Sequence, residues 1–251
     1  MEIWKNIWGL DISKREGRKS VEYRNELKYV VTEAELTLLE NRIRSLIRLD
    51  RHAGADGTYQ IRSLYFDDLE NTCYQENEMG TDPREKFRIR IYNGSADRIS
   101  LELKKKQHSM TQKLSCLLTE EQCRELMAGR PLPFDASYPP VLQKLNLLMR
   151  TRLMRPKVIV EYDRTPFVEK LGNTRVTLDR NIRSSNAVLS FLEKEIPGRP
   201  VMPAGRQILE VKYDEFLPDH LYRNLQLARL RQTAFSKYYL CRRFSYAGIR
   251  A

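Results

Sequence analysis

Alternating polar and apolar residues dominate this chain, and they predict β-strands. Successive side chains of a strand point to opposite faces, so a period of two marks a strand with one buried face. Runs of this kind, separated by turn signals such as Asn93-Gly94-Ser95, recur eight times along the sequence. They cover residues 21–31, 59–66, 86–92, 98–106, 110–116, 156–167, 174–179 and 206–213.

Helical signals lie between several of these runs. Thr32 followed by Glu35 is a capping box, and Leu36, Leu39 and Ile43 behind it share one helix face. Further helices or helical turns are expected at residues 67–77, after Thr119, at 141–149 and over most of 218–241. The pattern predicts an α+β fold, a closed eight-stranded antiparallel β-barrel with its helices packed outside.

The length of 251 residues and the absence of a low-complexity linker favour one large domain. We expect this domain to span residues 21–245. Residues 1–20 mix two tryptophans with basic side chains, and they are predicted to form a flexible basic N-terminal segment.

The polar faces of five predicted strands carry charged side chains. Grouped by strand, these faces hold Glu22, Arg24, Glu26 and Lys28; Lys86, Arg88 and Arg90; Glu102, Lys104 and Lys106; Arg175, Thr177 and Asp179; Glu210 and Lys212. One such strand would be typical of an ordinary antiparallel sheet with one solvated face. Five of them, with apolar faces covered by outer helices, predict that the charged faces meet inside the barrel. Basic groups crowded in a partly desolvated interior repel one another unless a polyanion lies among them.

The overall charge agrees with an anionic ligand. The formal net charge is +11, which favours nucleic acid, anionic membrane or phosphorylated small molecules. Nucleic acid is not expected, because the basic residues alternate within strands and do not form an exposed run with aromatics. The sequence has no GxxxxGK[ST], GxGxxG, GxSxG or HExxH motif, which argues against the phosphate cradles and catalytic sites built on them.

The cysteines and histidines argue against a structural zinc site. Four scattered cysteines without CxxC spacing and three histidines lack the usual ligand pattern, and they fit a reducing compartment. No apolar run approaches the roughly 20 residues needed to cross a bilayer. We therefore expect a cytoplasmic protein that is at most peripheral at the membrane.

Acidic residues share the charged faces with the basic ones. Glu26, Glu102, Asp179 and Glu210 offer hard oxygen ligands that suit Mg²⁺ or Mn²⁺ bridging phosphate oxygens. A simpler alternative is that these carboxylates only neutralise neighbouring lysines and arginines, and the sequence leaves both interpretations open.

Seven short motifs occur in order across residues 20–245. They are Arg24-Asn25-Glu26-Leu27-Lys28-Tyr29, Ser63-Leu64-Tyr65-Phe66-Asp67, Lys86-Phe87-Arg88-Ile89-Arg90-Ile91-Tyr92, Glu102-Leu103-Lys104, Tyr162-Asp163-Arg164-Thr165-Pro166-Phe167, Leu209-Glu210-Val211-Lys212 and Phe235-Ser236-Lys237. Together they resemble the VTC (vacuolar transporter chaperone) domain, the polyphosphate polymerase branch of the CYTH or triphosphate tunnel metalloenzyme superfamily.

The resemblance implies an eight-stranded tunnel in which the γ-phosphate of ATP is transferred to a growing polyphosphate chain with Mn²⁺ or Mg²⁺. The residues expected to act in catalysis are Arg88, Arg90, Lys104 and Lys237. The substrate-binding residues predicted from the resemblance and the charged faces are Arg24, Lys28, Arg62, Lys86, Lys106, Lys113, Arg164, Arg175 and Lys212. Glu210 is the expected principal metal ligand, with Glu26, Glu102 and Asp179 as further candidates.

Arg24 departs from the ExExK motif typical of tunnel triphosphatases, because it replaces the first glutamate and leaves Glu26. This change favours a polymerase over a triphosphatase. A non-catalytic polyphosphate receptor is the third alternative, and the carboxylate of Glu210 argues against it. ATP and inorganic polyphosphate are the expected partners, and a membrane-protein partner stays open.

Overall fold

The computed structural model describes residues 23–108 and 110–247. Eight strands of these residues form one antiparallel sheet in the order β1-β10-β8-β7-β3-β4-β5-β6. Their bounds are β1 (Asn25–Thr32), β3 (Tyr59–Asp67), β4 (Arg84–Tyr92), β5 (Ser95–Gln107), β6 (Met110–Leu118), β7 (Arg155–Glu169), β8 (Thr174–Ser185) and β10 (Arg206–Tyr213). All eight predicted strands are confirmed, although β8 runs beyond its predicted end at Asp179. The predicted flexible segment at residues 1–20 lies outside the described residues.

Two short strands were not predicted. They are β2 (Arg48–Leu49), which pairs with β7, and β9 (Arg199–Pro200), which pairs with β8. Each consists of only two residues, so neither can show the alternation that marks a strand in a sequence.

The helices follow the predicted positions. They are α1 (Glu33–Arg44), α2 (Thr72–Glu78), α3 (Glu120–Met127), α4 (Pro140–Thr151), α5 (Asp219–Asn224) and α6 (Lys237–Ala247), with single 3₁₀ turns at Leu171–Asn173, Val188–Ser190 and Leu227–Arg229. The capping box at Thr32 and Glu35 is confirmed. The expectation of mostly helical structure over 218–241 holds only in part, because residues 230–236 are not helical. None of the helices in the described part of the chain has both the length and the apolar character needed to span a bilayer.

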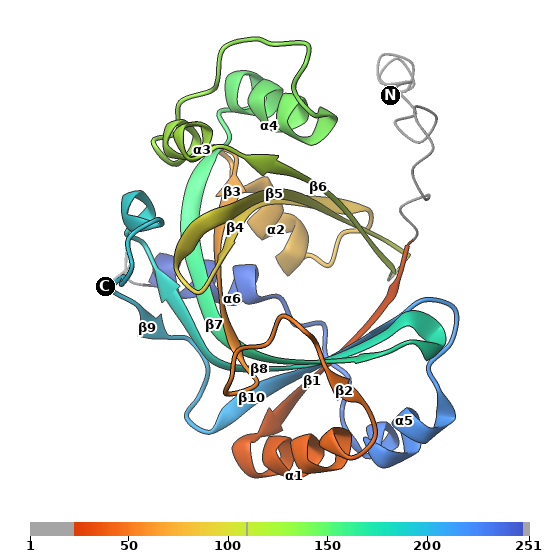
Figure 1. The fold of residues 1–251 in the computed structure, drawn as a ribbon. Helices are drawn as coiled ribbons and strands as arrows, with labels where there is room; N and C mark the ends of the chain where they lie inside the picture. Colours follow the sequence, from red (N-terminus) through yellow and green to blue (C-terminus); the bar gives the residue numbers. More distant parts are fainter. Residues whose placement is uncertain (1–22, 109, 248–251) are drawn as a thin grey trace.

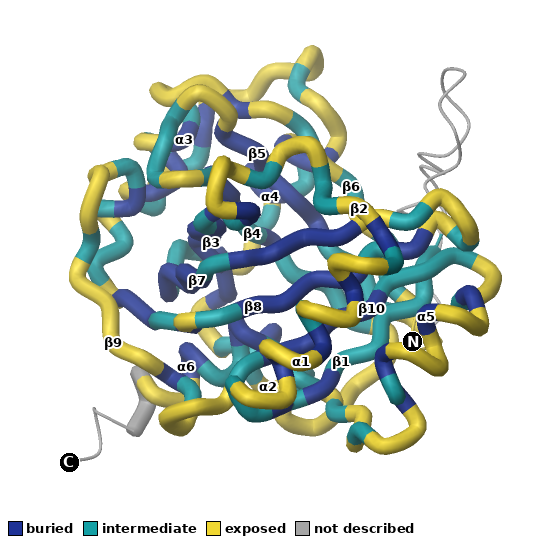
Figure 2. Tube along the Cα trace, turned by 60° about the horizontal axis from the view of Figure 1, so that its bottom comes forward, coloured by how far each residue is buried: buried dark blue, intermediate teal, exposed yellow. Residues whose placement is uncertain are grey.

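The sheet curls strongly, and its two sides are covered differently. In Figure 1, α3 and α4 pack above β5 and β6, α1 and α5 lie beneath β1 and β10, and α6 lies within the curl against β7. Buried positions follow the central strands in Figure 2, whereas the connecting loops are exposed. The prediction of outer helices is therefore correct for α1, α3, α4 and α5, and it is wrong for α6 and for α2, which packs against α6.

The sheet is a curled half-barrel, and the prediction of a closed barrel is not confirmed. Within the described residues, its edge strands β1 and β6 are bridged at one place, where Arg24 and Thr111 exchange two backbone hydrogen bonds of 2.9 Å. The chain before α6 lies along the free edge of β1, where the amide of Thr233 donates to the carbonyl of Lys28 at 2.9 Å. This connecting segment occupies the edge that a closed barrel would pair with β6.

Part of the interior is apolar, which the sequence pattern did not predict. There, β3, β7, β8 and β10 pack against Tyr238 and Cys241 of α6. The strand residues in this contact are Ile61, Val158, Val160, Ile182 and Ile208. On β3, Ser63 and Tyr65 contact the interior arginines, so the alternation directs Arg62 to the opposite face.

The predicted role of Arg62 in substrate binding is therefore corrected. Its guanidinium donates to Glu161 at 2.6 Å and to the carbonyls of Phe191 at 2.9 Å and Lys194 at 3.1 Å. With only 1% of its surface exposed, Arg62 holds the chain after β8 against the outside of the sheet. Its donors are already bound within the protein.

Replacing Arg62 with alanine is expected to destabilise the protein without weakening triphosphate binding. Removing one partner of a buried ion pair costs about 3 kcal/mol or more, because Glu161 keeps its buried charge. Urea denaturation measures the loss, and Arg98→Ala, an exposed arginine of β5, serves as the control. Unchanged stability together with lost triphosphate binding would return Arg62 to the binding site.

Candidate functional site

A basic cavity of about 360 Å³ lies inside the curl of the sheet. Ten basic side chains line it, contributed by β1, β4, β5, β7, β10 and α6: Lys28, Arg84, Lys86, Arg88, Arg90, Lys104, Lys106, Arg164, Lys212 and Lys237. Two carboxylates, Glu26 and Glu210, accompany them. Such an excess of positive charge in a confined space favours a ligand with several negative charges.

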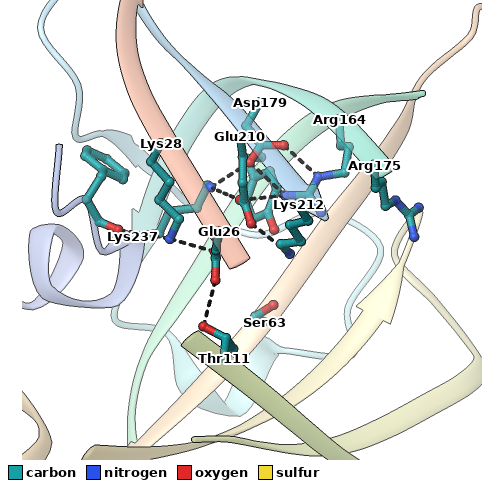
Figure 3. Close-up of polar contacts among 12 residues, drawn as sticks. Glu26, Lys28, Ser63, Thr111, Arg164, Arg175, Asp179, Glu210, Lys212 and Lys237 are labelled. Carbon is teal, nitrogen blue, oxygen red and sulfur yellow. Dashed lines mark hydrogen bonds and ion pairs between the residues drawn. The ribbon is translucent and has the colours of Figure 1, made fainter. Parts of the chain in front are cut away.

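The register of β1 and β10 brings lysines and glutamates together on one wall. Lys28 stands opposite Glu210, and Glu26 stands opposite Lys212. The ammonium of Lys28 lies 3.0 Å from Glu26, that of Lys104 lies 2.6 Å from Glu26, and that of Lys212 lies 2.7 Å from Glu210. Figure 3 shows Glu26 between Lys28 and Thr111, whose hydroxyl donates to it at 3.1 Å.

The two glutamates of this wall remain ionised in spite of their burial. Burial opposes the charge of Glu26, but Lys104 and Lys28 hold the pKa of its carboxyl well below the usual value. Burial likewise opposes the charge of Glu210, and Lys212 lowers its pKa even though the neighbouring carboxylate of Glu26 acts in the other direction. The two carboxylates are thus close enough to interact directly, and the lysines make this possible.

Asp179 organises a second group of charges. It accepts two hydrogen bonds from Arg164, at 2.6 and 2.8 Å, and one from Lys237 at 2.6 Å. Arg164 also lies 3.5 Å from Glu210, which connects this group to the first wall. Burial opposes ionisation of Asp179, but Arg164 and Lys237 place its pKa far below the usual value. Because its oxygens are occupied by cations and it is fully buried, Asp179 orients Arg164 and Lys237.

Arg88 and Arg90 lie on one wall, as the two-residue spacing predicted. Arg88 donates to Glu102 at 2.7 Å and to the hydroxyl of Tyr65 at 2.9 Å. Arg90 donates to Ser63 at 3.1 Å and to the hydroxyl of Tyr162 at 3.4 Å. These contacts fix the two guanidinium groups in place before any ligand binds, which reduces the entropy lost on binding.

Two lysines of the cavity have strongly lowered pKa values. Burial lowers the pKa of Lys86 to about 7, and Arg84 and Lys104 act in the same direction. Burial also lowers the pKa of Lys104 to about 7, where the attraction of Glu26 is opposed by Lys28 and Lys212. Positive charge is thus close to the limit that the cavity can hold without an anion.

The structure gathers most of the predicted site residues at the cavity but not all of them. Those that line it are Glu26, Lys28, Lys86, Arg88, Arg90, Lys104, Lys106, Arg164, Glu210, Lys212 and Lys237. Glu102 and Asp179 are buried beside it, where they bind its arginines. Arg24, Arg62, Lys113 and Arg175 are not among the residues that line it.

Arg24, Lys113 and Arg175 instead form ion pairs with acidic residues. Arg24 lies 2.5 Å from Asp214, Arg175 lies 2.6 Å from Asp50, and Lys113, whose side chain is 53% exposed, lies 3.1 Å from Glu102. Figure 3 shows the guanidinium of Arg175 pointing away from the central charges. Their role in substrate binding stays a prediction.

Some residues of the cavity were missed from the sequence. Tyr65 and Tyr162 bind the arginines, and Asn77 and Ser236 accept hydrogen bonds from Lys86 at 2.9 and 3.1 Å. Strand alternation could have identified Tyr162, because it lies two residues before Arg164 on β7. Asn77 and Ser236 lie on α2 and just before α6, where strand alternation gives no signal.

A divalent metal fits the cavity in one arrangement. The described residues contain no cluster of three or more potential metal ligands, so the predicted four-carboxylate set is not brought together. Glu26 and Glu210 do interact, and one oxygen of Glu26 is buried without a hydrogen-bond donor of good geometry. Mg²⁺ is often held by one or two carboxylates plus substrate phosphates and water. This pair can supply the protein ligands of such a site.

Comparison with solved structures shows that the fold is known in other proteins. An adenylyl cyclase candidate from Hippeastrum with a dominant triphosphatase activity is 12% identical, with a TM-score of 0.51, over 88% of this chain and 95% of that one. An adenylate cyclase candidate from Bacillus halodurans is 13% identical, with a TM-score of 0.47, over 82% and 88% of the two chains. The capping enzyme triphosphatase of Mimivirus is 10% identical, with a TM-score of 0.39, over 87% and 90%. Only the first of these structures has a TM-score above 0.5, and at 12% identity it is informative about the fold alone.

Sequence comparison identifies the family. No curated protein sequence matches the chain significantly. The VTC domain matches residues 23–246, which include the whole sheet and the first turns of α6. This confirms the resemblance carried by the seven motifs, and the chain belongs to the VTC domain family.

Proposed function

We propose that this protein is a polyphosphate polymerase, which transfers the γ-phosphate of ATP to the end of a polyphosphate chain inside the basic cavity. The observation that carries the proposal is the lining itself, in which ten basic side chains surround two carboxylates. A reaction between two polyanions needs such a lining, because the donor and the acceptor repel each other in water. ATP and inorganic polyphosphate are the proposed substrates.

The side chains serve this reaction by positioning and by electrostatic stabilisation. In the transfer, a terminal oxygen of the acceptor forms a bond to the γ-phosphorus, and the bond to the β-phosphate breaks to release ADP. The acceptor oxygen is already anionic, so little general-base help is required. Arg88 and Arg90, held on one wall by Tyr65, Ser63 and Tyr162, are oriented for forked bonds to the transferring group.

Mn²⁺ or Mg²⁺ is the proposed cofactor, with Glu210 and Glu26 as its protein ligands. When bound, it neutralises phosphate charge and polarises the phosphoryl oxygens. Lys28, Lys104 and Lys212 keep both carboxylates ionised and thus available as ligands. The predicted ligand roles of Glu102 and Asp179 are less well supported, since neither side chain is among those that line the cavity, unlike Glu26 and Glu210.

A triphosphatase on the same scaffold is the main alternative. Position 24 favours the polymerase. A glutamate there could have supplied a third carboxylate to hold metal or water, but this residue is Arg24. A non-catalytic receptor is the other alternative, and the interacting pair of Glu26 and Glu210 argues against it. A receptor that only binds anions needs no carboxylate as a metal ligand.

We further propose that a bound polyphosphate completes the tunnel. Among the described residues, backbone hydrogen bonds join the edge strands β1 and β6 of the half-barrel only at Arg24 and Thr111, and Lys28 and Lys104 face each other across Glu26. An anion between such cations relieves their repulsion and draws the two walls together. A membrane protein that receives the product remains a prediction.

Incubation with ATP and Mn²⁺ tests the function directly. We expect ADP together with acid-insoluble phosphate chains on a gel, and little free phosphate. Arg90→Ala is expected to lose this activity, whereas Arg98→Ala, at an exposed position outside the cavity lining, is expected to retain it. Stoichiometric free phosphate without chains would identify a triphosphatase, and tight polyphosphate binding without turnover would identify a receptor.

Glu210→Gln tests the metal site. We expect ADP release to fall roughly 100-fold, because a neutral amide is a poor ligand for a hard cation. Without metal, the same variant is expected to bind tripolyphosphate more tightly, since one negative charge near Lys212 is gone. Glu85→Gln, on the outer face of β4, is the matched control. Equal turnover at saturating Mn²⁺ would remove Glu210 from the site.

The lowered pKa of Lys86 predicts proton uptake on binding. The ammonium of Lys86 binds the neutral side chains of Asn77 and Ser236 and its pKa is about 7, so at pH 8 this amine is largely neutral, and an anion favours its protonated form. Calorimetry at pH 8 in buffers of different ionisation enthalpy is expected to show protons taken up with tripolyphosphate, and fewer for Lys86→Met. Equal uptake by both proteins would contradict this account.

The same lowered pKa predicts how the stability of the ligand-free protein changes with pH. Between pH 7 and the usual value of 10.5, the unfolded chain binds more protons at Lys86 than the folded one does. The contribution of Lys86 to the free energy of unfolding of the ligand-free protein therefore rises with pH in this window. Triphosphate opposes this trend, since it stabilises the protonated form.

A further inference from the structure

Asp67 is a buried carboxylate just outside the cavity, at the end of β3. One of its oxygens accepts hydrogen bonds from the amides of Asp68 at 3.0 Å and Cys73 at 2.9 Å. The other accepts from the amide of Tyr74 at 3.1 Å and from the hydroxyl of Tyr238. Asp67 is fully buried, so these four donors replace its hydration. The carboxylate thus joins the first turn of α2 to the first turn of α6.

Tyr238 transmits this attachment to the wall of the cavity. Its ring lines the cavity, with the ring of Tyr65 at a centroid distance of 5.2 Å and the ammonium of Lys86 at 5.4 Å. Its hydroxyl, by contrast, is bound to Asp67. Tyr238 is therefore held on the side away from the ligand and presents only its ring to the cavity.

The neighbouring residues of α6 are among the charged and polar groups of the site. Lys237 binds Asp179 at 2.6 Å and lies 4.6 Å from the centroid of the Tyr162 ring. Ser236, just before the helix, accepts a hydrogen bond from Lys86 at 3.1 Å. The first turn of α6 is thus fixed between two buried carboxylates, Asp67 on the α2 side and Asp179 on β8.

We propose that Asp67 is a positioning residue that acts through Tyr238 to place Lys237 against the transferring phosphate. This inference rests on the proposed function of the cavity. Residues 230–236, which precede α6, are attached to β1, where the amide of Thr233 donates to the carbonyl of Lys28 at 2.9 Å and the ammonium of Lys28 donates to the carbonyl of Phe235 at 3.0 Å. These contacts hold the start of α6 from the side of β1, and the bond between Asp67 and Tyr238 adds the attachment on the side of α2.

The ground state and the transition state depend differently on this constraint. Nine other basic side chains line the cavity, so a small shift of Lys237 changes the affinity for ATP little. Stabilisation of the transferring group depends on the position of each charge, and a misplacement of about 1 Å can reduce the rate up to roughly 100-fold. A positioning role therefore predicts a loss in kcat with little change in KM.

Tyr238→Phe tests the proposal, with turnover measured as ADP release, which polymerisation and hydrolysis share. We expect kcat to fall about tenfold and KM for ATP to stay within about twofold. Asp67→Asn is expected to act in the same direction. Tyr239→Phe is the matched control, because the hydroxyl of Tyr239 also contacts α2, at Glu78 (3.3 Å), and this residue does not line the cavity.

A double-mutant cycle separates positioning from general damage to the fold. Once Lys237 is removed, the Tyr238 hydroxyl has nothing left to position, so Lys237→Ala and Lys237→Ala/Tyr238→Phe are expected to have the same kcat. If Tyr238→Phe lowers kcat by the same factor in both backgrounds, it acts elsewhere and the proposal is wrong. A wild-type kcat for Tyr238→Phe would overturn it as well.

Hydrogen exchange supplies a readout that does not require turnover. Tripolyphosphate is expected to protect the amides of residues 237–240 in the wild type and in Tyr239→Phe, and to protect them less in Tyr238→Phe. Equal protection in all three proteins would refute the positioning role, whatever the enzyme makes. If tripolyphosphate does not bind at all, the proposed function fails. Faster exchange of these amides in ligand-free Tyr238→Phe than in Tyr239→Phe would still establish the anchor, and equal exchange would refute it.

Discussion

Repulsion among the basic side chains of the cavity is the constraint on which the rest of the site depends. An isolated buried charge costs several kcal/mol, and ten lysines and arginines in one cavity add mutual repulsion to that cost. The protein limits this cost with buried carboxylates that each bind two or more cations. Glu26 binds Lys28 and Lys104, and Asp179 binds Arg164 and Lys237. A polyanion can take over part of this role when it binds, so the cations are both stabilised and available.

The scaffold follows from the same requirement. Alternation along β1, β4, β5 and β10 places charges on the inner face, while the outer face packs against α1, α3, α4 and α5. A closed barrel would leave those charges facing one another at a fixed distance. The half-barrel instead ends in an edge lined by the segment before α6, with one bridge between Arg24 and Thr111. The position of α6 then determines where Lys237 lies among the charged side chains of the cavity.

The sequence predicted the features that depend on local alternation, and it failed where tertiary contacts decide. Arg88, Arg90 and Lys104 were correctly placed in the cavity because each belongs to a strand whose polar face is uniformly charged. Arg62 was misplaced because Ile61, Ser63 and Tyr65 form the inner face of its strand, so alternation directs Arg62 outward. The open edge and the inward position of α6 depend on where the chain goes after β10. No periodicity in the sequence reports that path.

The position of Arg24 links the fold to the choice between transfer and hydrolysis. Its guanidinium binds Asp214, and the carbonyl of Asn173, at the end of the strands, so it adds neither a carboxylate nor a charge to the cavity lining. Glu26 and Glu210 are then the carboxylates of the lining, and two ligands hold Mg²⁺ or Mn²⁺ well only when phosphate oxygens complete its shell. Under the polymerase proposal, a metal held in this way would be bound together with its substrate, with phosphate oxygens and water in its other positions. The proposed nucleophile is then a terminal phosphate oxygen of a second polyanion, which the ten basic side chains of the lining would hold beside the first.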